Sequence, residues 1–239
     1  MAKLSLSDRL RDPNSPEGRP RRAAYILPSL FTAANLFLGF LSLVYTFQGS
    51  VLFSTGGSGA RHFSLAAIFI GVAVFCDGLD GRIARMTNTV SEFGREADSL
   101  ADVITFGVAP AMLAFAWEVQ FIPVGDNPEA FEHFRRLGYF LCFLFLVCGA
   151  ARLARFNIQK NPVPKNPGRP DRKYFVGLPI PAAAGFVAAI VYAASGEPLH
   201  WWLLGAGWLG LMALLAFLMV STWRYASMKD IQLLRPRSF

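Results

Sequence analysis

The chain has 239 residues, of which 54% are hydrophobic and 16% charged, and its mean hydropathy is +0.39. This composition is too apolar for an ordinary soluble domain, and the length accommodates one membrane domain. The formal net charge of +7 lies on little polar surface and indicates an anionic partner. Because the sequence contains no module that reads nucleic-acid bases, we expect anionic membrane lipid and no nucleic acid.

The first 23 residues precede any apolar stretch. They carry charges of both signs and are rich in proline, which is typical of a short interfacial segment followed by a linker, or of a disordered tail. They lack the basic start and cleavable apolar core of a signal peptide. The sequence therefore divides into an N-terminal cytoplasmic or interfacial segment (1–23), a membrane domain (24–223) and a basic C-terminal tail (224–239).

Six apolar stretches follow, each close to the ~20 residues that cross a ~30 Å hydrocarbon core. They cover residues 24–48, 63–85, 99–118, 137–157, 177–196 and 199–222. We therefore expect an all-α, polytopic membrane protein with six transmembrane helices. Only the turn Gly196-Glu197-Pro198 separates the last two stretches, which predicts an antiparallel hairpin.

Basic residues are distributed unevenly between the two sides of this predicted bundle. If both termini lie on one side, 20 of the 23 Lys and Arg residues fall on that side. The positive-inside rule then places both termini in the cytoplasm.

The most informative stretch places four acids where lipid-embedded helices should avoid them. Asp77 and Asp80 are three residues apart and Asp98 and Asp102 four apart, so each pair shares a helical face. Carboxylates this close to the membrane repel one another unless cations neutralise them. Because no His or Cys is placed to favour zinc, we predict Mg²⁺ or Mn²⁺, bound as two ions that hold a diphosphate.

Simpler interpretations of this stretch stay open. The acids could be surface carboxylates of a cytoplasmic loop, paired with neighbouring arginines. Small residues on the same turns leave room for a nucleotide and its diphosphate to approach the backbone, or they let two helices pack closely. These small residues are Gly78, Gly81, Ala84 and Gly94.

The acids and small residues match the pattern Asp-x-x-Asp-Gly-x-x-Ala-Arg, eight residues, Gly, three residues, Asp, three residues, Asp at every fixed position. In this the sequence resembles the CDP-alcohol phosphotransferase family. The resemblance implies a six-helix bundle, commonly a homodimer, in which Asp77, Asp80 and Asp98 are metal ligands and Asp102 is a ligand and the general base. It also implies nucleotide contacts, at Gly81, Ala84, Arg85 and Gly94. We add Gly78 because it is small and lies between the first two acids.

Further segments resemble one branch of that family, the membrane-embedded phosphatidylserine synthases. They are residues 27–35, 105–111, 149–157 and 177–181, with Thr105 where many relatives have Ser. The resemblance implies transfer of the phosphatidyl group of CDP-diacylglycerol to L-serine, giving phosphatidylserine and CMP. It also implies a prokaryotic inner (plasma) membrane and a cytoplasmic active site.

Three polar residues outside the acidic stretch are further candidates for substrate binding. Arg152 and Arg155 lie on one face of the fourth helix, where they could hold a phosphate or the serine carboxylate, or simply reach for the membrane surface. Asn35 lies in an apolar run, where its amide needs a partner. That partner is either substrate or another helix.

Other functions remain possible at this point. The acidic pattern concerns only the CDP half of the lipid substrate and does not indicate the alcohol. Glycerol 3-phosphate, inositol phosphate and choline are therefore alternative acceptors to serine. A cation transporter could also gather carboxylates among helices. A transporter, however, predicts polar residues that cross the membrane, whereas these acids cluster toward one face.

Overall fold

The computed structural model describes the backbone of residues 22–87, 92–121, 128–159, 175–199, 201–221 and 224–225. Within this part of the chain, nearly every element is helical. The helical elements are α2 (Arg22–Ser54), α3 (Ala60–Thr87), α4 (Glu92–Asp102), the π-helix η1 (Val103–Val108), α5 (Ala109–Trp117), the 3-10 helix η2 (Val119–Phe121), α6 (Pro128–Gln159), α7 (Ile180–Ala193) and α8 (Trp202–Val220). The predicted N-terminal segment and C-terminal tail lie almost entirely outside the described residues.

Two strands of two residues each complete these elements. The strand β1 (Phe175–Val176) precedes α7, and β2 (Arg224–Tyr225) follows α8. They pair antiparallel, with Phe175 opposite Tyr225. Apart from this small pair, the all-α prediction is confirmed.

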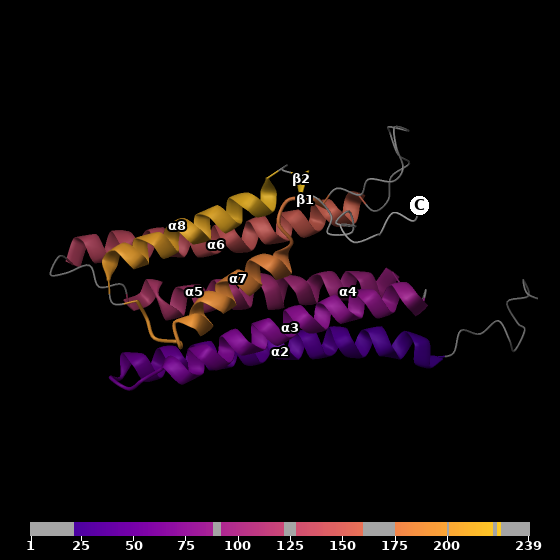
Figure 1. Cartoon of the computed structure of the whole chain (residues 1–239), viewed down its shortest axis with the longest axis horizontal. Helices are drawn as coiled ribbons and strands as arrows, with labels where there is room; N and C mark the ends of the chain where they lie inside the picture. Colours follow the sequence, from indigo (N-terminus) through magenta and orange to yellow (C-terminus); the bar gives the residue numbers. More distant parts are fainter. Residues whose placement is uncertain are drawn as a thin grey trace, which may run out of the picture.

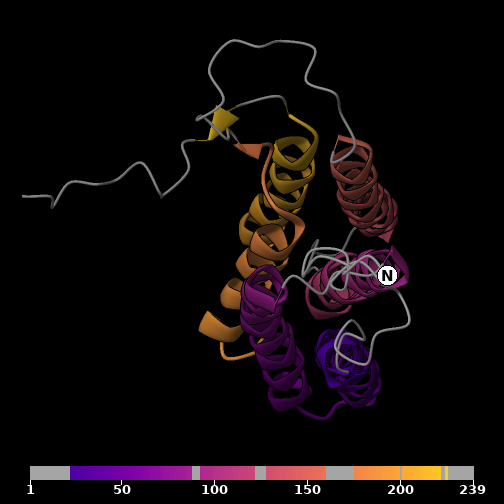
Figure 2. The same cartoon turned by 90° about the vertical axis from the view of Figure 1, so that its right-hand side faces the viewer.

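The helices lie roughly along the long axis of the molecule (Figure 1). Since α4, η1 and α5 follow one another without a break, they form one continuous rod. This rod packs against α2 and α6, and α3 packs against α2 and α7. Figure 2 shows the helices nearly end on, gathered around the bundle axis. The rod therefore lies between α2 and α6.

Five helical segments among the described residues are long and apolar enough to cross a membrane. They are Leu30–Ser54, Ala60–Leu79, Glu96–Phe121, Glu129–Asn157 and Trp202–Val220. Their outward faces carry large exposed apolar side chains such as Phe47, Phe75 and Phe143. A continuous apolar exterior is unfavourable in water and suits lipid, so the protein is an integral membrane protein.

The fifth predicted span is shorter than expected. With 14 residues, α7 is ~21 Å long at 1.5 Å per residue, less than the ~30 Å core. Gly177 has a φ of 78°, which bends the chain, and Pro179 has a ψ of 140°, so the residues directly before Ile180 are not helical. The Leu178 N–H donates to the Leu218 carbonyl at 3.0 Å, which holds this non-helical segment against the end of α8. The prediction of six full-length helices is therefore not confirmed.

The predicted turn between the last two helices is present. Ser195 and Gly196 both adopt positive φ, at 55° and 74°. However, α7 packs mainly against α3, whereas α8 packs mainly against α6. The two helices therefore follow each other through a tight turn but do not pack along each other as a simple hairpin.

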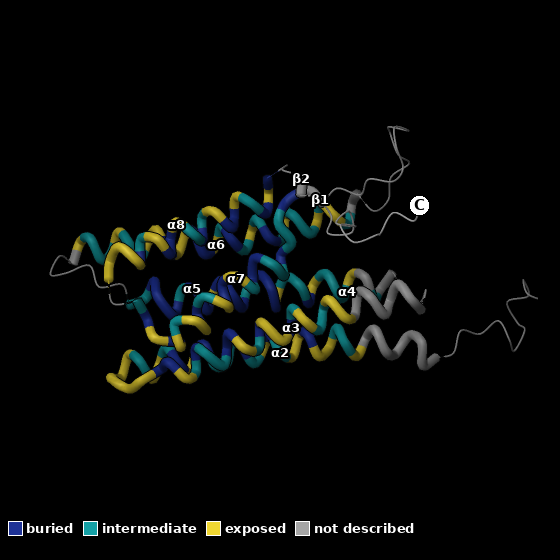
Figure 3. Tube along the Cα trace, viewed as in Figure 1, coloured by how far each residue is buried: buried dark blue, intermediate teal, exposed yellow. Residues whose placement is uncertain are grey.

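The core is densest around the central rod, as the dark segments of Figure 3 show. Its largest fully buried side chains include Phe106 and Trp117 of the rod, Phe63 of α3 and Phe145 of α6. The Trp117 ring meets that of Trp208 edge to face, with centroids 5.0 Å apart. Aromatic packing of this kind stabilises the rod against α8.

The end of the rod also carries a carboxylate with no solvent exposure. Glu118 directly follows α5, and its Oε2 accepts a hydrogen bond from the Leu199 N–H at 2.7 Å. Nearby, the Trp208 Nε1–H donates to the Ala114 carbonyl at 3.2 Å. These bonds attach the α7–α8 connection and α8 itself to the end of α5.

Gly196 should be harder to replace than Gly56, the glycine with φ of 84° that follows α2. A Cβ at Gly196 would collide with the Ala60 carbonyl oxygen, whereas a Cβ at Gly56 would meet no described atom within 4 Å. Both alanine variants bear the similar backbone cost of about 1–2 kcal/mol. Gly196→Ala should therefore lower the thermal unfolding midpoint in detergent clearly more than Gly56→Ala does. Equal shifts would contradict the close approach to α3.

Candidate active site

Three of the four predicted acids come together at one end of the bundle. Asp77 of α3 and Asp98 and Asp102 of α4 each offer a carboxylate oxygen, and these oxygens lie within 4.8 Å of one another. All three side chains are partly buried. The side chain of Asp80 lies outside the described residues.

The α4 segment brings two of these acids together by its helical repeat. Asp98 and Asp102 are four residues apart in a continuous helix, so both project from the same face. On α3, Asp77 lies near the end of the apolar span that closes at Leu79. The site therefore forms where the lipid-spanning part of α3 ends.

The three acids fit a divalent cation. Clustered carboxylate oxygens are the ligands that Mg²⁺, Mn²⁺ and Ca²⁺ prefer, whereas soft ligands are absent from this trio. Three negative charges at such separations repel one another unless a cation or protons neutralise them. The donor set thus suits a hard metal ion, and Asp77, Asp98 and Asp102 are the residues that would hold it.

The structure describes the surroundings of only some of the predicted nucleotide-binding residues. Gly78 is exposed, and a Cβ at this position would meet no described atom within 4 Å. Close packing among the described helices therefore does not explain the absence of a side chain at Gly78. Gly94 is partly buried, and the side-chain environments of Gly81, Ala84 and Arg85 lie outside the described residues.

Asn35 is buried close to the segment that follows the acids. It is 3% exposed, and its main-chain carbonyl accepts a hydrogen bond of 3.1 Å from the Thr105 hydroxyl. Its side-chain Oδ1 has no hydrogen-bond partner among the described residues. The structure therefore leaves the predicted role of the amide open, although it shows that the main chain of Asn35 connects α2 with η1.

The two predicted arginines of α6 have different surroundings. The Arg152 side chain is partly buried, and its Nε has no hydrogen-bond partner among the described residues. Arg155 makes a long hydrogen bond of 3.5 Å from Nη1 to the Val220 carbonyl at the end of α8. Arg152 therefore keeps more donor capacity for an anionic substrate.

Two features of the site were missed by the sequence reasoning. The π-helix η1 begins at the residue after Asp102, a position where hydropathy gives no sign of a widened turn. In addition, the Asn157 amide donates to the Ser99 hydroxyl at 2.8 Å, which ties α6 to the residue after Asp98. An unexplained polar residue near the end of an apolar stretch was the available signal for Asn157.

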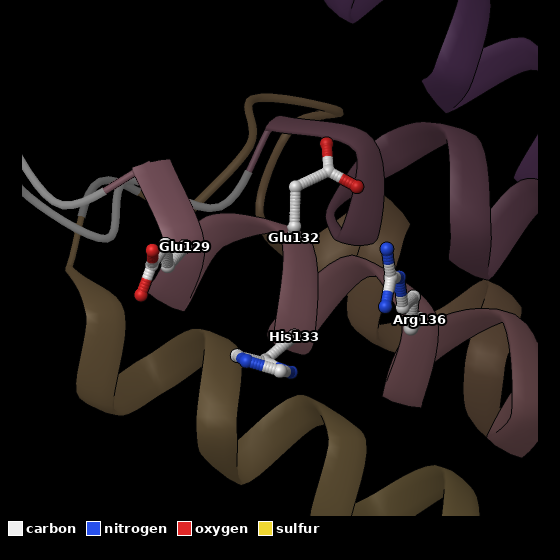
Figure 4. A pocket seen from close by; sticks show the side chains of 4 residues that line it. All are labelled: Glu129, Glu132, His133 and Arg136. Carbon is white, nitrogen blue, oxygen red and sulfur yellow. The ribbon is translucent and has the colours of Figure 1, made fainter.

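A separate pocket lies at the opposite end of the bundle, at the start of α6. Figure 4 shows the four side chains that line this cavity of about 310 Å³, Glu129, Glu132, His133 and Arg136. Glu132 already pairs with Arg135 at 2.7 Å. This pocket is remote from the aspartates, so it is not part of the candidate active site.

Residues 25–226 match the family described as CDP-alcohol phosphatidyltransferase. The chain belongs to this family. The match includes all five candidate spans and the three clustered aspartates.

Relatives in this family are similar over much of their length. The CDP-diacylglycerol–serine O-phosphatidyltransferase of Helicobacter pylori is 38% identical over 216 residues, which are 89% of this chain and 77% of that protein. The protein of the same name from Bacillus subtilis is 30% identical over 203 residues, 85% of this chain and 91% of the relative. The archaetidylserine synthase of Methanothermobacter thermautotrophicus is 34% identical over 160 residues, 66% of this chain and 54% of the relative.

Replacing Asp98 by Asn should weaken Mn²⁺ binding by at least about tenfold, or ~1.4 kcal/mol, because one of the clustered carboxylates is lost. Electron paramagnetic resonance of Mn²⁺ titrated into the detergent-solubilised protein measures this change. Glu132→Gln, which alters a carboxylate at the other end of the bundle, is the matched control and should leave binding unchanged. Equal affinity for wild type and Asp98→Asn would exclude Asp98 as a ligand.

Proposed function

We propose that the protein is a CDP-diacylglycerol–serine O-phosphatidyltransferase, which transfers the phosphatidyl group of CDP-diacylglycerol to L-serine and releases CMP. The observation that carries this proposal is the convergence of Asp77, Asp98 and Asp102 within 4.8 Å in a chain of this family. A diphosphate-bearing lipid is the type of substrate that a cation-binding cluster at a membrane surface suits.

The acceptor is inferred from the relatives. The names of the two bacterial relatives and of the archaeal one all contain serine, although they differ in the lipid. Serine is therefore favoured over glycerol 3-phosphate, inositol phosphate and choline. The family match also disfavours the cation transporter considered from the sequence.

Two divalent metal ions, Mg²⁺ or Mn²⁺, fit this reaction, with Asp80 as the fourth acidic ligand. When bound, they would supply charge neutralisation for the diphosphate and for the departing CMP. This role needs carboxylates that are held in place by rigid elements. The helical frames of α3 and α4 meet that need for Asp77, Asp98 and Asp102.

Asp102 acts in this proposal as the general base. Its carboxylate accepts the proton of the serine hydroxyl while the serine oxygen forms a bond to the phosphorus that bears the lipid. The bond between that phosphorus and the oxygen of CMP breaks in the same step. Because the protein itself forms no covalent bond in this reaction, the rate depends mainly on how well it positions the two substrates relative to each other.

Substrate binding is shared between the small residues and the basic ones. Gly78, Gly81, Ala84, Arg85 and Gly94 line the approach of the CDP moiety. The guanidinium of Arg152, with Arg155 and Asn35, binds a phosphate or the serine carboxylate. Two observations support the roles of Arg152 and Asn35: the Arg152 Nε and the buried Asn35 Oδ1 have no hydrogen-bond partner among the described residues.

The membrane arrangement is part of the same proposal. We infer that α7, although only ~21 Å long, makes a sixth crossing together with the non-helical residues that precede it. The strand pair and the Leu178–Leu218 hydrogen bond satisfy part of this backbone, which an apolar environment requires. Both termini and the aspartates face the cytoplasm of a prokaryotic inner membrane, and the protein forms a homodimer.

The purified protein should release CMP from CDP-diacylglycerol when serine and Mg²⁺ or Mn²⁺ are present, and a chelator should abolish this release. Parallel reactions contain glycerol 3-phosphate, inositol phosphate or choline in place of serine, with phosphatidylserine formation followed by mass spectrometry. Release that depends on another acceptor would keep the family and overturn serine as the substrate.

Asp102→Asn should reduce turnover by about 10²-fold or more, since the amide cannot accept the serine proton. The variant should still elute from size exclusion as the wild type does, because Asn preserves the size of the side chain. Serine-dependent turnover near the wild-type rate would remove Asp102 as the base.

A further inference from the structure

The π-helix η1 begins at the residue after Asp102 and continues to α5. A π-helix uses wider turns than an α-helix, and one extra residue rotates the elements on either side by roughly 100° relative to each other. The direction of the aspartate face relative to the buried face of α5 therefore depends on this segment. Since π-turns are rare, specific contacts must favour this one.

Thr105 makes such a contact from the middle of η1. Its side chain is 0% exposed, and its hydroxyl donates to the Asn35 carbonyl of α2 at 3.1 Å. Opposite it lies Gly39, where a Cβ would come 2.5 Å from the Thr105 Oγ1 and 2.9 Å from the Thr105 Cα. The absence of a side chain at Gly39 thus creates a recess in α2 that the Thr105 hydroxyl fills.

The recess at Gly39 and the Thr105–Asn35 hydrogen bond together define one rotational position of η1 against α2. A rotation of η1 would move the hydroxyl away from the Asn35 carbonyl and bring a different side chain against Gly39. The same contact fixes the turn of α2 that carries Asn35, whose side-chain Oδ1 is buried without a described partner. The Thr105–Asn35 hydrogen bond therefore connects two parts of the candidate site. One is the rod, which carries Asp98 and Asp102, and the other is α2, which carries the Asn35 amide.

We propose that Thr105 is a positioning residue: its hydroxyl, held in the Gly39 recess against the Asn35 carbonyl, sets the register of η1 and thereby aligns Asp98 and Asp102 with Asp77 for metal binding. The residue touches neither metal nor substrate and acts through the aspartates. The proposal rests on the metal-binding role of these acids in the proposed function.

The test compares Thr105→Val, which keeps the shape but loses the hydroxyl, with Thr105→Ser, which keeps the hydroxyl. Thr105→Val should weaken Mn²⁺ binding by roughly fivefold, the factor expected for loss of an ordinary hydrogen bond, and should lower kcat more than it raises the KM for serine. Thr105→Ser should stay within about twofold of wild type. Gly39→Ala, which fills the recess, should reproduce the Thr105→Val effect.

Thr46→Val is the matched control. Thr46 lies on α2, is 2% exposed, and its hydroxyl has no hydrogen-bond partner among the described residues. The same change of a buried threonine to valine should therefore leave Mn²⁺ affinity and kcat unchanged. A loss equal to that of Thr105→Val would show a general effect of removing buried hydroxyls and would overturn the proposal.

Mn²⁺ affinity is measured by electron paramagnetic resonance well below the unfolding midpoint, so a change in stability alone does not alter it. If Thr105→Val lowers the midpoint but keeps the wild-type affinity, Thr105 is only structural and the proposal fails. If Thr105→Val does not fold, Thr105→Ser is compared with Thr105→Cys, whose thiol is a weaker donor. Equal affinities in that pair would also overturn the proposal.

The two proposals fail in different ways. Absence of serine-dependent CMP release from a wild-type protein that binds Mn²⁺ would overturn the proposed reaction and leave the register test intact. A folded wild type that binds no Mn²⁺ would overturn the positioning role itself.

Discussion

Repulsion among the carboxylates of Asp77, Asp98 and Asp102 is the constraint on which the rest of the structure depends. Three such groups within 4.8 Å, at the end of a lipid-spanning helix, are unfavourable unless a cation compensates for them. Rigid helices must then hold the acids against that repulsion. The contacts of the rod with α2 and α6, including the Asn157–Ser99 hydrogen bond, supply this support close to the acids.

The same rod carries a buried carboxylate, that of Glu118, at its other end. Glu118 and the aspartates differ in their surroundings and therefore in their roles. Glu118 has no solvent exposure and accepts the Leu199 N–H, so one of its oxygens joins helices together. The aspartates instead face one another and remain partly exposed. A single buried acid bound to a backbone donor stabilises a connection between helices, whereas a group of mutually facing acids creates a site for a cation.

The sequence was sufficient for features that depend on local spacing. Apolar length located five spans, and the four-residue interval between Asp98 and Asp102 placed both on one face of α4. It was insufficient where tertiary contacts overrode local preference. The π-turn after Asp102 depends on a recess at Gly39, about sixty residues earlier in the chain, and hydropathy cannot report such a contact. Similarly, residues 177–179 look like the start of a span but are not helical: Gly177 has a positive φ, and α8 provides an acceptor for the Leu178 N–H.

That non-helical segment determines how much of α3 is exposed beside the acids. Gly185 of α7 lies beside Val74 of α3, about one turn before Asp77, and the chain ahead of Ile180 turns toward the end of α8. In Figure 1, α2 and α3 accordingly extend beyond the point where α7 begins. Gly78 and Leu79 are exposed on α3 at this level, and no described atom lies within 4 Å of a Cβ at Gly78. Had α7 continued as a full-length helix along α3, it would have covered this surface. The short α7 thus leaves the part of α3 next to Asp77 exposed, and in the proposed reaction this is the side from which the lipid headgroup would approach.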